Sequence, residues 1–253
     1  MGSILKVNAL TKKYKDFMLE NINFEVRNNS IVGFVGANGA GKTTTIKLIL
    51  GLIHADGGEI TYFNDDSYSI RQKQVKDRIG VVLDDSCFYE DFTIAEMKKL
   101  IASSYSNWDE KVYLDYLEQF QLNPKSKIKS LSKGMKMKFS LALALSHHAE
   151  LLIMDEPSSG LDPLVRKELN DILINFAKTN NNSVFFSTHI TSDLDRIADT
   201  IIFIHYGKIK EYGDKSELLK KYAGIHKGTI LEGKDNPNIE DVMIYFSQQG
   251  EEK

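Results

Sequence analysis

The sequence contains a single cysteine, no excess of basic residues and no long hydrophobic run. Cys87 has no second cysteine with which to form a disulfide, and one thiol cannot build a cysteine metal cluster. We interpret Cys87 as a small packed residue. The 32 Lys and Arg residues are balanced by 35 Asp and Glu residues, giving a net charge of -3. This balance gives no support to nucleic-acid binding over a basic face.

The chain also lacks the signals of secreted, lipidated and membrane-spanning proteins. Residues 1–7 have no apolar signal-peptide core, and Lys6 stands where a myristoylation signal has Ser or Thr. The most apolar region, residues 141–154, is shorter than the roughly 18 residues of a membrane span. It is also interrupted by His147, His148 and Glu150, of which we interpret the two histidines as structural. We therefore expect a soluble chain, so that any membrane span would belong to another protein.

Residues 36–44, G-A-N-G-A-G-K-T-T, match the G-x-x-x-x-G-K-T pattern of a phosphate-binding P-loop. They lie between an apolar, strand-like run (31–35) and a helix-like run (45–50), as that motif requires, whereas a glycine-rich turn without a ligand would not need this order. Glycines let backbone N–H groups converge on a polyphosphate, and the following helix adds the positive end of its dipole. Lys42 would reach the β- and γ-phosphates, and Thr43 would ligate Mg²⁺. The predicted phosphate-binding residues are Gly36, Asn38, Gly39, Ala40, Gly41, Lys42, Thr43 and Thr44.

The hydrophobic pattern predicts an α/β protein. Short apolar runs at 31–35, 79–83, 150–155 and 183–187 are typical of buried strands, and helical patterns at 161–178 and elsewhere separate them. Strands that alternate with helices predict a parallel sheet. The alternating segments 4–10, 21–26 and 58–63 predict a small antiparallel β-layer, and 200–204 with 208–212 a further strand pair.

The remaining segments predict mainly helix. We expect a surface helix over 69–78, helices over 93–105, 109–121 and 136–148, and one more after Asp214; Thr93 and Asp214 each begin a capping-box pattern. Because residues 85–148 show no strand pattern, we expect an inserted helical subdomain there, within an α/β domain spanning 1–223. Residues 224–253 are expected to form a loosely attached C-terminal extension with one short element around 239–246.

Acidic residues and a histidine follow two of the buried strands. In parallel sheets ligands bind at the carboxyl ends of strands, so the P-loop, Asp155 and His189 can converge there. Asp155 suits Mg²⁺, held directly or through water beside Thr43. Glu156 would then face the γ-phosphate and could orient and deprotonate a water molecule. An acidic turn before Pro157 is the alternative explanation of this pair.

Over roughly residues 4–220, the sequence resembles the ATP-binding cassette (ABC) ATPases. L-S-K-G-M at 131–135 is similar to the family signature, S-G-L-D at 159–162 is similar to its D-loop, and a histidine at 189 stands at the place of the switch histidine. The resemblance implies a P-loop NTPase fold and hydrolysis of ATP. It implies catalytic roles for Glu156, His189 and Lys42, with His189 contacting the γ-phosphate and the attacking water. It also implies nucleotide contacts from Tyr14, Ser132, Gly134 and Asp162.

The resemblance further implies that two cassettes pack head to tail, each ATP lying between one P-loop and the other cassette's signature. Ser132 and the N–H groups near Gly134 lie at a helix N-terminus, which attracts anions, and Lys133, Lys136 and Lys138 add positive charge. We therefore expect ATP and Mg²⁺ as cofactors, a second cassette and an integral membrane permease as partners, and no nucleic acid. The chain would be peripheral at the cytoplasmic face of the membrane, and cytoplasmic when alone. Tyr14 would stack on adenine; the alternative is an ordinary core or surface tyrosine.

The sequence departs from the family pattern in two motifs. The signature is commonly L-S-G-G-Q, whereas this chain has Lys133 and Met135, and Asp84 stands where the family has a glutamine that touches Mg²⁺ and senses the membrane subunit. An aspartate can accept from metal-bound water, so we include Asp84 among the metal residues. Both departures resemble cassettes of bacterial ABC-2-type exporters, including those linked to antimicrobial-peptide and bacitracin-like resistance.

The aromatic segment 86–92 follows Asp84. In the family this region forms the groove for a coupling helix of the membrane subunit; alternatively, Phe88, Tyr89 and Phe92 belong to the core of the helical subdomain.

These observations predict an ATP-binding and ATP-hydrolysing subunit that powers a separate permease, an exporter of peptides, antibiotics or other amphipathic compounds. The main alternative is a non-transport ABC ATPase acting on nucleic acid or the ribosome. Such proteins usually carry two cassettes or long coiled coils, and this chain has neither. A P-loop kinase is a third possibility, but it would have no reason to carry the signature and the switch histidine.

Overall fold

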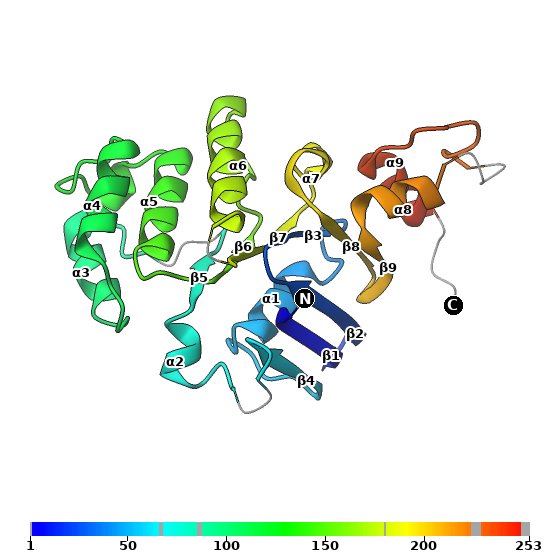
Figure 1. Cartoon of the computed structure of the whole chain (residues 1–253), viewed down its shortest axis with the longest axis horizontal. Coiled ribbons are helices and arrows are strands. Elements are labelled where there is room, and N and C mark those ends of the chain that lie inside the picture. The colour runs from blue at the N-terminus through cyan, green and yellow to red at the C-terminus, as the bar shows by residue number, and fades with distance from the viewer. Residues whose placement is uncertain (1, 66–67, 85–87, 180, 224–228, 249–253) are drawn as a thin grey trace.

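The computed structural model describes residues 2–65, 68–84, 88–179, 181–223 and 229–248. Cys87, with its prediction as a packed residue, lies outside them. The described residues form a six-stranded sheet of order β5-β6-β7-β3-β8-β9 and a three-stranded sheet of order β2-β1-β4 (Figure 1). The strands are β1 (Ser3–Lys13), β2 (Met18–Arg27), β3 (Ile31–Val35), β4 (Gly57–Tyr62), β5 (Ile79–Val82), β6 (Leu151–Asp155), β7 (Ser183–Thr188), β8 (Thr200–His205) and β9 (Lys208–Asp214).

The large sheet is parallel from β5 to β8, with β9 antiparallel at its edge, and the small sheet is antiparallel. Both sheets were predicted from the sequence and are confirmed. The helices are α1 (Lys42–Ile49), α2 (Lys73–Lys76), α3 (Ile94–Ala102), α4 (Glu110–Gln119), the 3-10 turn η1 (Ile128–Ser130), α5 (Lys133–Leu145), α6 (Pro163–Ala177), α7 (Thr191–Ile197), α8 (Lys215–Lys221) and α9 (Ile239–Gln248).

The parallel strands are buried on both faces, and each face belongs to a different hydrophobic core. In β3, Val32 and Phe34 pack with α1 and the small sheet, whereas Ile31 and Val35 pack with α5, α6, α7 and α9. Figure 1 shows this layering, with α1 and the small sheet on one side of the large sheet and α6 and α7 on the other. Burial on both faces explains why these strands read as continuous apolar runs.

Helices α3, α4 and α5 fill the interval between β5 and β6, where the sequence showed no strand pattern; the boundaries of a helical subdomain stay a prediction. Thr93 and Glu96 form the predicted capping box at the start of α3. Helix α5 begins at Lys133 and not at residue 136, because the Ser132 hydroxyl caps it by accepting from the Met135 N–H at 3.2 Å. Among the described residues, no helix combines the length and apolar character needed to cross a bilayer.

Two helices differ from the sequence-based prediction. The surface helix expected over 69–78 is only four residues long, because Val75 is its one buried residue and an isolated polar helix has little to stabilise it. Helix α7 was not predicted at all. Its seven residues bury only Leu194 and Ile197 among apolar side chains, too few to show a periodic pattern.

The prediction of a loosely attached C-terminal extension is wrong for residues 239–248. Helix α9 packs against α7 and β8, with Ile239 and Val242 completely buried. Phe246 lies 5.4 Å from the Phe203 ring and 5.6 Å from the Tyr222 ring, measured between centroids. The apolar positions 239, 242, 245 and 246 form one face of the helix, which the polar residues around them obscure in the sequence.

Replacing Phe246 with alanine should therefore destabilise the whole protein. Loss of a buried aromatic side chain costs about 3–5 kcal/mol, which a denaturant titration or a thermal melt would detect. Gln248→Ala, at an exposed position of the same helix, should change the free energy of unfolding by less than about 0.5 kcal/mol. Equal stability of the two variants would contradict the assignment of α9 to the core.

Candidate nucleotide site

The order of the large sheet brings the predicted catalytic loops together. Strands β6, β7 and β3 are neighbours, and their carboxyl ends lead into Asp155–Glu156, Thr188–His189 and the P-loop. Val35 is paired with Thr188, and Asp155 with Ser187. Residues from three distant parts of the sequence therefore meet at one edge of the sheet, where α/β proteins bind their ligands.

The P-loop has the backbone geometry that a phosphate site needs. A Cβ atom at Gly36 would lie 2.3 Å from the Ile204 carbonyl oxygen, so that no larger residue fits. Gly41 has φ 112° and precedes α1, which no side chain of the described residues caps. The N–H groups of the first turn of α1 are thus left for a ligand, and they carry the positive end of the helix dipole. This arrangement fits a bound polyphosphate.

Lys42 is held at the centre of this loop. Its side chain is only 5 % exposed, and its Nζ donates to the carbonyl oxygens of Gly36 at 2.7 Å and Ala37 at 3.2 Å. The same ammonium group lies 3.2 Å from Oε1 of Glu156. The cation predicted to bind the β- and γ-phosphates is therefore buried and fixed in place.

Glu156 lies between Lys42 and His189. Its second oxygen, Oε2, accepts a 2.7 Å hydrogen bond from Nδ1 of His189 and a longer one, 3.3 Å, from the backbone N–H of the same residue. Glu156 has φ 48°, a left-handed conformation that costs about 1–3 kcal/mol in a non-glycine residue and is typical of functional sites. The three residues predicted to be catalytic thus form one hydrogen-bonded cluster.

Ser187 was not predicted as a site residue. Its hydroxyl donates to Oδ1 of Asp155 at 2.5 Å and accepts from the Glu156 N–H at 3.0 Å, so it orients both acidic residues. The sequence signal was its place directly before Thr188 and His189, at a strand end that faces Asp155.

The nearly buried Asp155 carboxylate and the exposed Thr43 hydroxyl are oxygen donors of the kind Mg²⁺ prefers, so the residues present fit that ion.

The sequence also matches known proteins over most of its length. A family model described as "ABC transporter" matches residues 19–159, more than half of the chain. The chain belongs to the ABC transporter family. Its prediction as an ABC-type ATPase is confirmed, and we refer to it below as the cassette.

Relatives and solved structures agree with this assignment. The cassette is 36 % identical to the bacitracin transport ATP-binding protein BcrA of Bacillus licheniformis, over 83 % of this chain and 70 % of that protein. It is 33 % identical to the lantibiotic transport ATP-binding protein SrtF of Streptococcus pyogenes, over 86 % of this chain and 95 % of that protein. A solved ATP-binding subunit of an ABC transporter has 26 % identity and a TM-score of 0.82, with 97 % of this chain and 100 % of that chain covered. A cassette solved as a dimer with ADP and phosphate shares the fold, with a TM-score of 0.72 and 23 % identity. The match covers 83 % of this chain and 98 % of that chain.

The signature of the cassette lies in a separate groove. A cavity of about 500 Å³ is lined by Ser132, Gly134, Gly160 and Asp162 among others, and none of its lining residues belongs to the P-loop. Asp162 caps α6 by accepting from the N–H groups of Leu164 and Val165. The N-terminus of α5, capped by the neutral Ser132 hydroxyl, opens into this groove and favours an anion there, whereas the N-terminus of α6 is already occupied by the Asp162 carboxylate. The predicted nucleotide contacts of Ser132, Gly134 and Asp162 stay predictions.

Asp84, predicted as a metal residue, makes a contact that the sequence did not suggest. Its Oδ1 lies 3.0 Å from Nζ of Lys133 in the signature. Its carboxylate is therefore engaged by a lysine in this structure, and its role toward Mg²⁺ stays a prediction.

The aromatic residues after Asp84 divide between core and surface. Phe88 packs against the core with its ring 5.1 Å from that of Phe139, whereas Tyr89 is 60 % and Phe92 39 % exposed. Beside them is a largely apolar groove of about 380 Å³ between β5, α3 and α5. Its lining residues are Val81, Leu83, Phe88, Met97, Ile101, Ser104, Tyr105, Ser140, Leu143 and Ala144.

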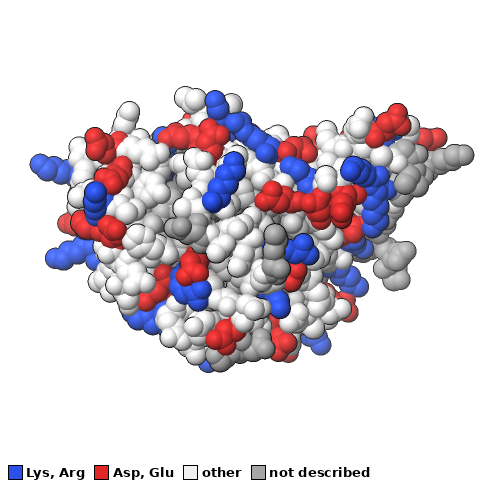
Figure 2. Space-filling model, in the orientation of Figure 1, with Lys and Arg blue, Asp and Glu red and all other residues white. Residues whose placement is uncertain are grey.

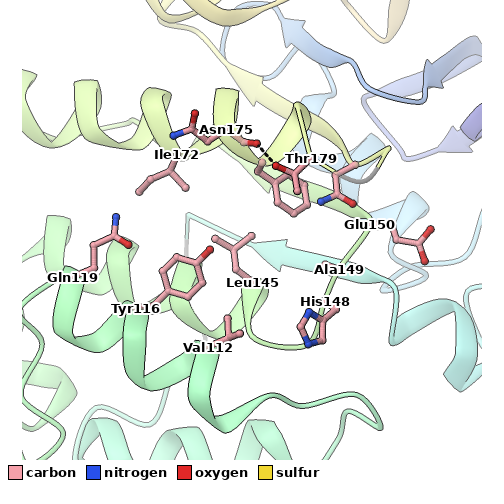
Figure 3. A pocket seen from close by; sticks show the side chains of 12 residues that line it. Val112, Tyr116, Gln119, Leu145, His148, Ala149, Glu150, Ile172, Asn175 and Thr179 are labelled. Atoms are coloured by element: carbon pink, nitrogen blue, oxygen red, sulfur yellow. Dashed lines mark hydrogen bonds between the residues drawn. The ribbon is translucent and has the colours of Figure 1, made fainter.

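Another cavity, of about 600 Å³, lies away from the catalytic cluster. In Figure 3, Tyr116 and Gln119 of α4 face Ile172 and Asn175 of α6 across it. Ala149, which also lines it, precedes β6 and so lies at the opposite end of that strand from Asp155. This cavity is therefore not the nucleotide site.

His147 and His148 are also remote from the catalytic cluster. His147 is completely buried, its ring is stacked 3.8 Å from that of Tyr105, and burial lowers its pKa below the usual value of a histidine. His148 lies 3.2 Å from a carboxylate oxygen of Asp109. His147 takes part in packing and His148 in a local polar contact, which agrees with their interpretation as structural residues.

Tyr14 lies beside the P-loop with an accessible ring. It is 49 % exposed, so it is not a core tyrosine, and its ring lies 6.4 Å from that of Phe17. Phe17 in turn packs against the phosphate loop, since its Cζ atom lies 3.0 Å from the point where a Cβ atom on Gly41 would stand. The ammonium of Lys12 lies over this ring, 5.7 Å from its centroid, and the stacking of Tyr14 on adenine stays a prediction.

Replacing Tyr14 with alanine should weaken ATP binding by roughly fivefold to a hundredfold, because stacking of a base on an aromatic ring contributes about 1–3 kcal/mol. Titration calorimetry on the cassette would measure this change. Tyr14→Phe keeps the ring and should bind ATP like the wild type. An unchanged dissociation constant for Tyr14→Ala would exclude the stacking role.

Proposed function

We propose that the cassette is the ATP-hydrolysing subunit of a bacterial exporter of peptide antibiotics or similar amphipathic compounds. The cluster of Lys42, Glu156 and His189 carries the hydrolytic part of this proposal. The transport part rests on relatives named for bacitracin and lantibiotic transport, which align with most of the chain.

Each residue of the cluster has one task in hydrolysis. Lys42 binds the β- and γ-phosphates with its ammonium group, which the loop carbonyls already hold in place. Glu156 accepts a proton from the attacking water, and His189 holds the carboxylate through Nδ1. Thr43 and Asp155 would hold Mg²⁺, whose charge offsets that of the phosphates when it is bound.

A second cassette completes the site. The groove at Ser132 and Gly134 offers the N-terminus of α5 and nearby lysines, but no P-loop residue lines it. A partner cassette would bring its γ-phosphate to this groove, and the exchange is reciprocal. ATP then acts as a reversible clamp between two chains, which a permease converts into transport.

The permease would dock in the apolar groove between β5, α3 and α5. The exposed Tyr89 and Phe92, whose rings lie 5.0 Å apart, extend the apolar surface near it. The amphipathic end of a membrane helix suits such a groove. Over the face seen in Figure 2, Lys and Arg are interspersed with Asp and Glu, so that face offers no extended basic field for nucleic acid.

The proposal is tested by placing a charge in the groove. Ile101→Lys should reduce recovery of the co-expressed cognate permease at least about tenfold, because a lysine must be desolvated to enter an apolar interface. Leu114→Lys, on the exposed face of α4, is the matched control and should recover the permease normally. Equal recovery by both variants, or co-sedimentation with ribosomes in place of the permease, would contradict the proposed partner.

The cargo is tested by survival. Cells that express the cassette and its permease should tolerate more bacitracin or lantibiotic than cells that express the permease with an inactive cassette. Equal sensitivity to these and to related amphipathic peptides would contradict the proposed cargo and leave the ATPase assignment intact.

A further inference from the structure

Two of the three residues that depart from the family pattern, Asp84 and Lys133, contact each other. Asp84 replaces the usual glutamine after β5, and Lys133 replaces a common glycine of the signature; Nζ of Lys133 lies 3.0 Å from Oδ1 of Asp84. The residues are far apart in the sequence, so no local pattern brings them together. Each departure therefore supplies the charge that the other one pairs with.

Stability alone does not explain this pair. The side chains are 48 % and 41 % exposed, and exposed ion pairs contribute little to folding. Lys133 is moreover in the first turn of α5, where a cation opposes the helix dipole. A neutral or acidic residue at position 133 would favour the helix more.

The position of the pair relates three parts of the cassette. Asp84 directly follows Leu83, which lines the apolar groove. Lys133 belongs to the signature, and its Cδ and Nζ lie 3.3 and 3.4 Å from the point where a Cβ of Gly160, in the D-loop, would stand. Since Gly160 has φ +68° and no side chain, the lysine can lie across the D-loop on its way to Asp84. Through the pair of Lys133 with Asp84, the signature is thus in contact with both the D-loop and the segment that lines the groove.

We infer that Asp84 and Lys133 act as one positioning unit, which holds the first turn of α5 and the D-loop against the segment that lines the groove. The inference rests on the proposed function, in which the signature binds the partner's ATP and the groove binds the permease. Because a contact shared by two binding sites couples their affinities, ATP at the signature and the permease in the groove affect each other through this pair.

A double-mutant cycle tests the unit without adding repulsive charges. Asp84→Asn, Lys133→Met and the double variant are made in a Glu156→Gln background, and the ATP concentration for half-maximal dimerisation is measured by light scattering. Each single variant should need about twofold to fivefold more ATP, the range that exposed ion pairs support. The double variant should need the same increase and not the product of the two, and Lys133→Arg, which keeps the pair, should lie within about twofold of the parent.

The same cycle applies to the permease. For this measurement the variants are made in the protein that keeps Glu156, so that ATP is hydrolysed. Stimulation of ATP hydrolysis by the co-expressed permease should fall by a similar factor in both single variants and in the double variant. Lys98→Met and Glu110→Gln form the control cycle, since this 2.6 Å pair joins α3 to α4 and contacts neither the signature nor the segment after β5. The control variants should leave both measurements within about twofold of the parent.

Independent action of the two residues would overturn the inference. If Lys133→Met raises the ATP requirement while Asp84→Asn leaves it unchanged, Lys133 acts on the partner's phosphates by itself. If Asp84→Asn instead raises the Mg²⁺ requirement and the losses multiply, Asp84 acts at the metal. If the Glu156→Gln parent dimerises with ATP but the two increases in ATP requirement multiply in the double variant, only the pair is rejected. If the parent never dimerises with ATP, the proposed function is rejected as well. A lower melting temperature with no change in ATP requirement would reduce the pair to a structural role.

Discussion

Glu156→Gln should lower the rate of ATP hydrolysis by about a hundredfold to ten-thousandfold, the contribution of a positioned general base. Glutamine keeps the size of the side chain and its carbonyl can still accept from Nδ1 of His189, but it cannot take a proton from water. Phosphate release under saturating ATP and Mg²⁺ measures the change.

The same variant should accumulate as an ATP-bound dimer, because closure no longer ends in hydrolysis. Glu240→Gln, at an exposed position of α9, should hydrolyse ATP like the wild type and should not accumulate as a dimer. A Glu156→Gln protein that turns over ATP normally would exclude Glu156 as the base. One that binds ATP but never dimerises would exclude the shared site.

Lys42→Ala should abolish ATP hydrolysis, with a loss of at least about a hundredfold, as expected for the removal of a preorganised charged donor. The buried ammonium contacts the loop carbonyls and Glu156, and the proposed function places it against the phosphates as well. Its removal also leaves Glu156 without its cation, so we expect a lower melting temperature in a protein that is still folded at 25 °C.

Lys47→Ala is the matched control for this variant. Lys47 lies on the same helix, α1, but is exposed and outside the phosphate loop, so its loss should leave hydrolysis within about twofold of the wild type. Circular dichroism verifies that both variants are folded. Near-normal phosphate release by folded Lys42→Ala would undermine the P-loop assignment.

The parts of the fold that could be predicted are those whose signal is local. Strands β3, β5, β6 and β7 are buried on both faces, and this burial appears in the sequence as unbroken apolar runs. The capping box of α3 and the cap of α8 by Asp214 depend on residues within one turn. The glycine spacing of the P-loop likewise reflects a local backbone requirement.

The parts that were missed depend on contacts across the chain. Ser187 orients Asp155 and Glu156 only because β6 and β7 pair in one particular register. The ion pair of Asp84 with Lys133 depends on how α5 packs beside β5. Helix α9 was underestimated because its apolar face matters only where α7 and β8 offer it a core. No single stretch of sequence contains these relations.

The central claim, that each ATP site is made by two chains, is tested most directly by mixing two inactive variants. Lys42→Ala disables the P-loop, and Gly134→Asp places a negative charge where the partner's phosphate would bind. The new Cβ at position 134 would be 3.5 Å from Val165, an ordinary contact, and an acidic residue suits the first turn of α5, so the second variant should fold.

Each variant alone should be inactive, because every site then lacks one half. In an equal mixture, half of the dimers are mixed, and each mixed dimer has one complete site of two. The mixture should therefore regain up to about a quarter of the wild-type rate of phosphate release per chain. A mixture that stays as inactive as its two components, although both bind to each other, would contradict the account.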